Sequence, residues 1–196
     1  MRESGCHKSS PPVDRAPAWR PAQRRLHWWT ALLVGVTFPL GWVMVRIPFS
    51  LLLLKFLAYQ LHKTIGILVV GFVLARLVLR LRYGRPDSID LVGWRRRAAS
   101  AAHGVLYVLL LVTPVLGYLT ASTAPNRIPT LFLGLIPIPS VLGPDRFWFA
   151  VLQWLHASAA IALVTVAAGH ASVAVLHHVH GRRDLLRMWR GSPPAC

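Results

Sequence analysis

The sequence predicts an all-α integral membrane protein, built as a four-helix bundle. This prediction rests on two observations. Hydrophobic residues make up 55% of the 196 residues, and the mean hydropathy of +0.50 is too high for a typical soluble domain. Four apolar runs, at about residues 27–46, 57–80, 102–122 and 148–176, each approach or exceed the roughly 20 residues that cross a bilayer. We therefore expect four transmembrane helices.

The first run is too long for a signal peptide and lacks a small-residue cleavage site, so we expect it to remain as a span. Residues 1–22 mix proline, serine and charge and are predicted to be a disordered tail. The membrane domain then covers 23–190, and 191–196 form a C-terminal tail.

The connection 83–98 is expected to be a short loop. The connection 123–147 contains five prolines, which argues against a further span and favours a loop folded onto the membrane surface. It would be either a lid over a site or a cap on the bundle.

Charge predicts the orientation of these spans, because Lys and Arg stay on the cytoplasmic side of short loops. Sixteen Lys and Arg residues lie in the two tails and the second connection, and five lie in the other two connections. Both termini are therefore expected in the cytoplasm.

The net charge of +16 could also indicate nucleic-acid binding. These charges flank apolar spans, however, where topology and anionic lipid headgroups account for them, so the predicted partner is the bilayer and not nucleic acid.

Five histidines lie in or at the edge of the predicted spans: His27, His62, His103, His156 and His170. Ionisable residues inside a membrane are costly, which makes them functional candidates. His156 and His170 are fourteen residues apart, so they return to within about 40° of one helix face and differ in depth by about 21 Å. Because successive spans alternate in direction, His27 should lie level with His170, and His62 level with His156. The sequence thus predicts two cross-helix pairs, His27 with His170 and His62 with His156.

Paired imidazoles at two depths favour haem b, whose iron usually takes two axial histidines. A zinc site would need three or four ligands at one depth, and a proton relay would need carboxylates, which the spans lack. No CxxCH motif is present, so the haem should be bound non-covalently. A flat porphyrin also needs a small residue one turn beyond each ligand. The residues at i+4 after the four paired histidines are Ala31, Gly66, Ala160 and Ala174, whereas His103 is followed by Tyr107.

Several polar residues near the spans are candidates for contacts to haem propionates or to a quinone. His103 is expected in such a role. Arg76 and Arg80, one turn apart, either pair with propionates or extend to lipid phosphate. Lys63 adjoins His62. A quinone headgroup needs only a few polar groups at the edge of an apolar cleft. The candidates are Gln23, His103, Arg76 and Tyr107 on the cytoplasmic side, and Gln60, Lys63 and Gln153 on the outer side.

These residues resemble the bacterial cytochrome b561 family, small four-helix membrane proteins with two haems. The matching stretches are QRRLHWW with His27, LHKTIG with His62, RLVLRLRYGRP from Arg76, HGVLYVLLLVTP from His103, and the His156–His170 pair followed by HH and DLLRMW. The resemblance implies that His27, His62, His156 and His170 are the haem-iron ligands. It also implies two non-covalent haems b, ubiquinone as partner, and the bacterial inner membrane as location. The sequence departs from the family where Leu155 and Ala157 flank His156, because relatives tend to have Trp and a carboxylate there.

Two functions are compatible with this resemblance. One family activity is superoxide oxidase, in which superoxide becomes dioxygen and the electron passes to ubiquinone. The outer connections favour it, since five Lys or Arg against Asp145 would attract an anionic substrate. The alternative is an electron-relay subunit that docks a peripheral hydrogenase or dehydrogenase and passes its electrons to quinone. No catalytic side chain is predicted for either function.

Overall fold

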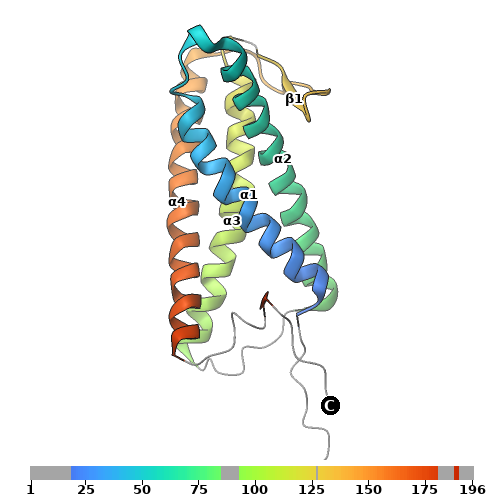
Figure 1. Ribbon diagram of the computed structural model, residues 1–196, viewed down its shortest axis with the longest axis vertical. Coiled ribbons are helices and arrows are strands. Elements are labelled where there is room, and N and C mark those ends of the chain that lie inside the picture. Colours follow the sequence, from blue (N-terminus) through green and yellow to red (C-terminus); the bar gives the residue numbers. More distant parts are fainter. Residues whose placement is uncertain (1–18, 85–92, 127, 181–187, 190–196) are drawn as a thin grey trace, which may run out of the picture.

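The computed structural model describes residues 19–84, 93–126, 128–180 and 188–189, and it contains four long helices. They are α1 (Pro21–Met44), α2 (Leu52–Tyr83), α3 (Trp94–Thr123) and α4 (Arg146–Val179), with a single 3-10 turn, η1 (Phe49–Leu51), before α2. Each overlaps one predicted apolar run, and all four are long and apolar enough to cross a membrane. The predicted four-helix membrane bundle is therefore confirmed (Figure 1).

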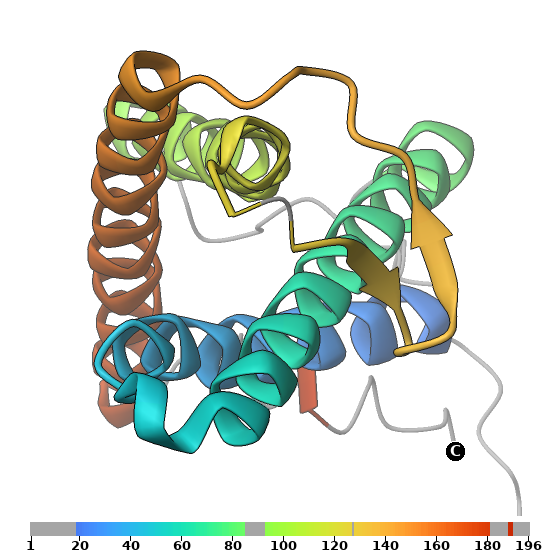
Figure 2. The ribbon, with the colours of Figure 1, turned by 90° about the horizontal axis from the view of Figure 1, so that it is seen from above.

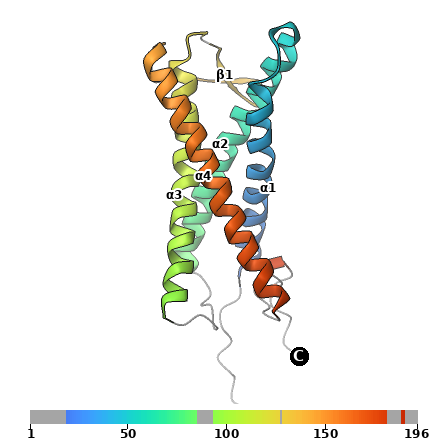
Figure 3. The ribbon, with the colours of Figure 1, turned by 90° about the vertical axis from the view of Figure 1, so that its left-hand side faces the viewer.

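The helices run alternately up and down and surround a common axis when the bundle is viewed from above (Figure 2). The most extensive contacts join α1 to α2 and α3 to α4, whereas α1 and α4 make few contacts. Figure 3 shows that α4 is inclined relative to α3 and α1. We call the end where α1 and α3 begin the basic end, and the opposite end, at the top of Figure 1, the hairpin end.

The start of α1 is joined to the end of α2 by one buried amide. Pro21 occupies the first turn of α1, where its missing N–H costs nothing. Gln23 Oε1 accepts from the backbone N–H of Arg20 (3.2 Å), and Gln23 Nε2 donates to the carbonyl of Gly84 (3.1 Å). Residues 21 and 22, placed in the disordered tail by the sequence, thus belong to the helix. The rest of that tail up to residue 18, and the tail 191–196, lie outside the described residues.

The buried core lies midway along the bundle. It comprises Ile65, Val69 and Val73 of α2, Leu110 of α3 and Leu163 of α4. On α4, Leu163 stands halfway between His156 and His170, so this apolar layer separates the two histidine levels. Most other large apolar side chains point outward, as expected when the solvent around the helices is lipid.

The connection between α3 and α4 contains a β-hairpin that the sequence does not predict. Strands β1 (Thr130–Phe132) and β2 (Ile136–Ile138) pair antiparallel, with Thr130 opposite Ile138. The turn consists of Leu133, Gly134 and Leu135. The φ angles of Leu133 and Gly134, 54° and 73°, are both left-handed. Such short strands rarely stand alone in proteins. Here α2 supplies the missing partner.

The hairpin is held on α2 by buried polar side chains. Gln60 Nε2 donates to the carbonyl of Pro129 (2.8 Å), and Gln60 Oε1 accepts from the N–H of Leu131 (3.0 Å). One turn further, the N–H of Leu133 donates to Thr64 Oγ1 (3.1 Å). The two α2 side chains thus satisfy the free edge of β1, in the way a neighbouring strand would.

Candidate functional site

His62 of α2 and His156 of α4 face each other near the hairpin end. Their ring centroids are 6.2 Å apart and the rings are nearly perpendicular, at 88°. His62 Nδ1 donates to the carbonyl of Thr37 (3.1 Å), and His156 Nδ1 donates to the carbonyl of Thr113 (2.9 Å). A carbonyl can only accept, so both rings carry their proton on Nδ1. The lone pair is then on Nε2, the tautomer in which a hydrogen-bonded imidazole binds a metal.

Each of these rings also lies against a glycine on the helix that carries its threonine. A Cβ built on Gly41 would stand 2.8 Å from His62 Cε1, and one built on Gly117 would stand 2.9 Å from His156 Cε1. Real Cβ atoms do not come so close, so only glycine lets the ring reach the backbone. Neither glycine is among the site residues predicted from the sequence. The signal is the repeated pattern T-x-x-x-G, present as TFPLG at 37–41 and TPVLG at 113–117.

His27 of α1 and His170 of α4 form a second pair toward the basic end. Their ring centroids are 6.5 Å apart, with the rings at 69°. His103 of α3 lies beside them, its centroid 5.1 Å from that of His170, and its Nδ1 donates to the carbonyl of Ala99 (2.6 Å). Three imidazoles therefore gather at this level, against two at the other.

Arg76 gives His27 a tautomer different from that of the hairpin-end pair. Arg76 Nη2 lies 3.2 Å from His27 Nδ1, and because a guanidinium can only donate, Nδ1 is the acceptor. Arg76 and Arg80 also lie over the same ring of Tyr107, each 5.3 Å from its centroid. Of the two arginines expected near haem propionates, Arg76 therefore contacts the basic-end pair, and Arg80 shares the ring of Tyr107 with it.

Three polar residues that were expected to contact a propionate or a quinone form hydrogen bonds within the protein instead. Lys63 Nζ lies 3.4 Å from the carbonyls of Ile128 and Pro129, so it faces the hairpin. Both ends of the Gln60 amide bind β1, and both ends of the Gln23 amide bind Arg20 and Gly84. These two glutamines, expected as quinone contacts, hold the fold together because a buried amide needs partners at both ends.

The spacing within each pair suits one metal ion between two imidazoles. Two imidazoles that each bound the same metal ion at about 2.0 Å, from opposite directions, would have ring centroids about 6 Å apart. The measured 6.2 and 6.5 Å agree with this value, whereas the 5.1 Å between His103 and His170 is too short. Within the described part of the chain, no three His, Cys, Asp or Glu side chains converge on one point. The residues present thus fit a cofactor that brings the other ligands itself, as haem does.

The chain is similar to known proteins over its whole bundle. A family model described as prokaryotic cytochrome b561 matches residues 18–191, which include all four helices. Cytochrome b561 homolog 1 of Escherichia coli (strain K12) is 31% identical over 169 residues, covering 83% of this chain and 92% of the relative. Cytochrome b561 homolog 2 of the same organism is 30% identical over 167 residues, covering 84% of this chain and 87% of the relative.

Proposed function

This chain belongs to the prokaryotic cytochrome b561 family, and from that premise we propose that it transfers electrons from superoxide to ubiquinone through two haems b. Family membership makes it a bacterial multi-pass membrane cytochrome b with a role in electron transfer. The proposal adds the number of haems, their ligands, the two substrates and the orientation in the membrane.

The observation that carries the proposal is the pair of facing imidazoles at each of two depths. His62 and His156 would hold one haem, and His27 and His170 the other. Bound haem b supplies an iron that gains and loses one electron. The carbonyls of Thr37 and Thr113 fix the ring orientation of His62 and His156 and keep Nε2 deprotonated.

At the basic end, Arg76 has to change partner for His27 to become a ligand. Its bond to Nδ1 leaves the His27 proton on Nε2, the atom that would bind iron. We infer that Arg76 would pair with a propionate instead of His27 when haem is bound, since a carboxylate is a stronger acceptor than a neutral ring. The His27 proton would then reside on Nδ1, which leaves Nε2 free to bind iron. Arg80 lies over the same Tyr107 ring and would bind the second propionate.

Charge supports superoxide as the donor at the hairpin end. Arg46, Lys55, Lys63 and Arg146 lie at this end with Asp145. Such a field would attract a small anion. The basic residues at the opposite end support cytoplasmic termini in the bacterial inner membrane, with the hairpin end outside.

Ubiquinone would be reduced at the basic end, where His103 and Tyr107 are polar groups beside the apolar core. Two superoxide ions each give one electron and leave as dioxygen. The two electrons, with two protons from the cytoplasm, convert ubiquinone to ubiquinol. A few polar groups at the edge of an apolar region suffice to orient such a headgroup.

Stopped-flow absorbance of the purified holoprotein with ubiquinone tests this function. We expect superoxide to reduce the haem faster than it dismutates, with the electrons appearing as ubiquinol. The His156→Ala variant should lose this reaction, and His178→Ala, an exposed histidine of the same helix, should keep it. Absence of haem reduction in the wild type would contradict the proposal. If a dehydrogenase or hydrogenase also co-purified in fixed proportion from native membranes, the relay function would replace it.

A further inference from the structure

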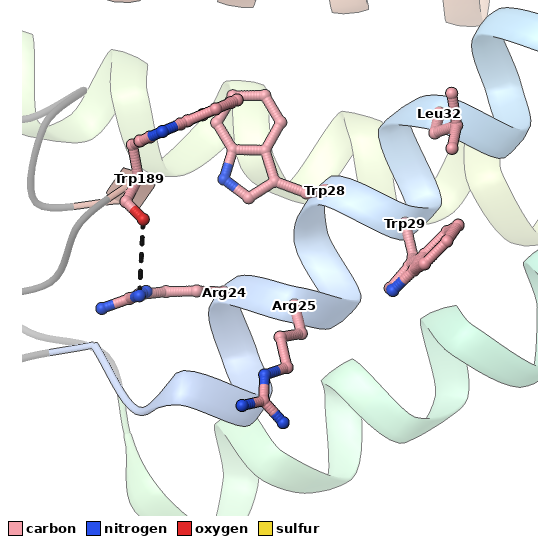
Figure 4. A pocket seen from close by; sticks show the side chains of 6 residues that line it. All are labelled: Arg24, Arg25, Trp28, Trp29, Leu32 and Trp189. Atoms are coloured by element: carbon pink, nitrogen blue, oxygen red, sulfur yellow. Dashed lines mark hydrogen bonds between the residues drawn. The ribbon is translucent and has the colours of Figure 1, made fainter.

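A pocket on the outside of the bundle combines arginines and tryptophans at the basic end of α1 (Figure 4). The six residues that line it, which we call the Arg24 pocket, are Arg24, Arg25, Trp28, Trp29, Leu32 and Trp189. None of the six is a paired histidine, although the ring of Trp28 meets that of His27 with centroids 5.4 Å apart. The electron-transfer proposal gives the arginines, Trp29, Leu32 and Trp189 no role.

Residues far apart in the sequence build the pocket. Trp28 Nε1 donates to the carbonyl of Met188 (3.2 Å), and the rings of Trp28 and Trp189 meet edge to face with centroids 4.9 Å apart. Arg24 Nη2 reaches the carbonyl of Trp189 at 3.4 Å, the contact drawn in Figure 4. The segment 188–189 therefore forms one wall, and α1 forms the other.

At the arginine end of the pocket, one hydrogen-bond donor is left without an acceptor by the described residues. Arg24 Nε is buried, and within the described part of the chain it has no hydrogen-bond partner. A buried guanidinium N–H without an acceptor costs free energy, and this cost is relieved by an anionic oxygen. Arg25, the next residue on α1, adds a second positive charge at the same level.

The rest of the pocket is apolar and open to the membrane. On α1, Trp28 and Trp29 follow the arginines by four residues and Leu32 follows Trp28 by four, so the wall continues about 12 Å along the helix into the bilayer. The side chains of Trp29, Leu32 and Trp189 are 54%, 53% and 63% exposed. A ligand that fills the pocket must therefore be anionic at one end and hydrocarbon at the other.

We propose that the Arg24 pocket binds one anionic phospholipid. Its phosphate lies at Arg24 and Arg25, and an acyl chain follows Trp29 and Leu32. Arginine pairs well with phosphate oxygens, and basic pockets at the ends of membrane helices suit acidic headgroups. Free phosphate would leave the exposed tryptophan and leucine surfaces uncovered. A zwitterionic lipid would bring no net negative charge to the two arginines, because its ammonium group cancels its phosphate.

Native mass spectrometry of the purified holoprotein, with lipid titrated into the detergent, tests the proposal. We expect one phosphatidylglycerol to be retained per chain at concentrations where phosphatidylcholine is not. In the Arg24→Gln/Arg25→Gln variant the affinity for phosphatidylglycerol should fall about 30-fold. The Arg82→Gln/Arg97→Gln variant removes two exposed charges at the same end of the bundle and should bind as the wild type does.

Measurements on the wild type alone keep the test decisive if the double variant does not fold. Inorganic phosphate and dihexanoyl phosphatidylglycerol should fail to displace the long-chain lipid at equal concentration. Displacement by inorganic phosphate would indicate a simple anion site and overturn the proposal. So would equal retention of phosphatidylcholine, or unchanged retention of phosphatidylglycerol by the Arg24→Gln/Arg25→Gln variant.

Discussion

Two glycines determine how closely the proposed haem ligands His62 and His156 approach the neighbouring helices. Gly41 and Gly117 each allow an imidazole to reach a carbonyl one turn earlier on the same helix. The sequence could reveal the histidines, because imidazoles inside an apolar helix are conspicuous. It could not reveal these glycines, because small residues are common in membrane helices and their role depends on which face turns toward the neighbour.

The Gly117→Ala substitution should therefore displace His156. The new Cβ would stand 2.9 Å from His156 Cε1, and relieving such overpacking costs about 1–3 kcal/mol. We expect weakened or lost binding of the hairpin-end haem, measured as haem per protein and as the amplitude of its absorbance band.

Gly104→Ala on the same helix is the matched control. A Cβ at Gly104 meets nothing within 4 Å, and alanine favours a helix over glycine by about 1 kcal/mol. This variant should keep both haems and be at least as stable as the wild type. Equal haem content in Gly117→Ala and Gly104→Ala would contradict the proposed role of Gly117.

At the scale of elements, the helices follow from the sequence and the hairpin does not. Long apolar runs between basic segments predict helices, because backbone groups in lipid must be satisfied within the segment. The segment that forms β1 and β2 shows no polar and apolar alternation and contains prolines. Its hydrogen-bond partners are side chains of α2, Gln60 and Thr64, rather than a third strand. No local pattern encodes such pairing.

The Gln60→Leu substitution should loosen the hairpin without unfolding α2. It leaves the Leu131 N–H without its partner, at a cost of about 1–3 kcal/mol, and it leaves the Pro129 carbonyl only the Lys63 ammonium as a donor. We expect faster hydrogen–deuterium exchange at Leu131, measured by mass spectrometry of the fragment that contains β1. Gln153→Leu, at an exposed position of α4, is the control. Exchange that is equally slow in both variants would show that Gln60 does not hold the hairpin.

The whole molecule repeats one arrangement on its two sides at the hairpin end. In the α1–α2 pair, His62 lies against Thr37 and Gly41 of its neighbour, and in the α3–α4 pair His156 lies in the same way against the threonine and glycine of α3. The fourteen-residue spacing on α4 then provides a second ligand level, about 21 Å away, across the apolar layer of Leu163. This spacing and the alternating direction of the helices predicted which histidines lie at the same depth in the bundle. The Arg76–His27 contact was not predictable, because it depends on how α1 and α2 cross.

The most direct test of the account is the haem content of single-histidine variants, measured as haem per chain together with low-temperature optical spectra. The wild type should contain two low-spin haems b. His62→Ala and His156→Ala should lose the same haem, and His27→Ala and His170→Ala the other, while His178→Ala keeps both. If His156→Ala retained two haems with unchanged spectra, or lost the same haem as His27→Ala, the proposed pairing would be wrong.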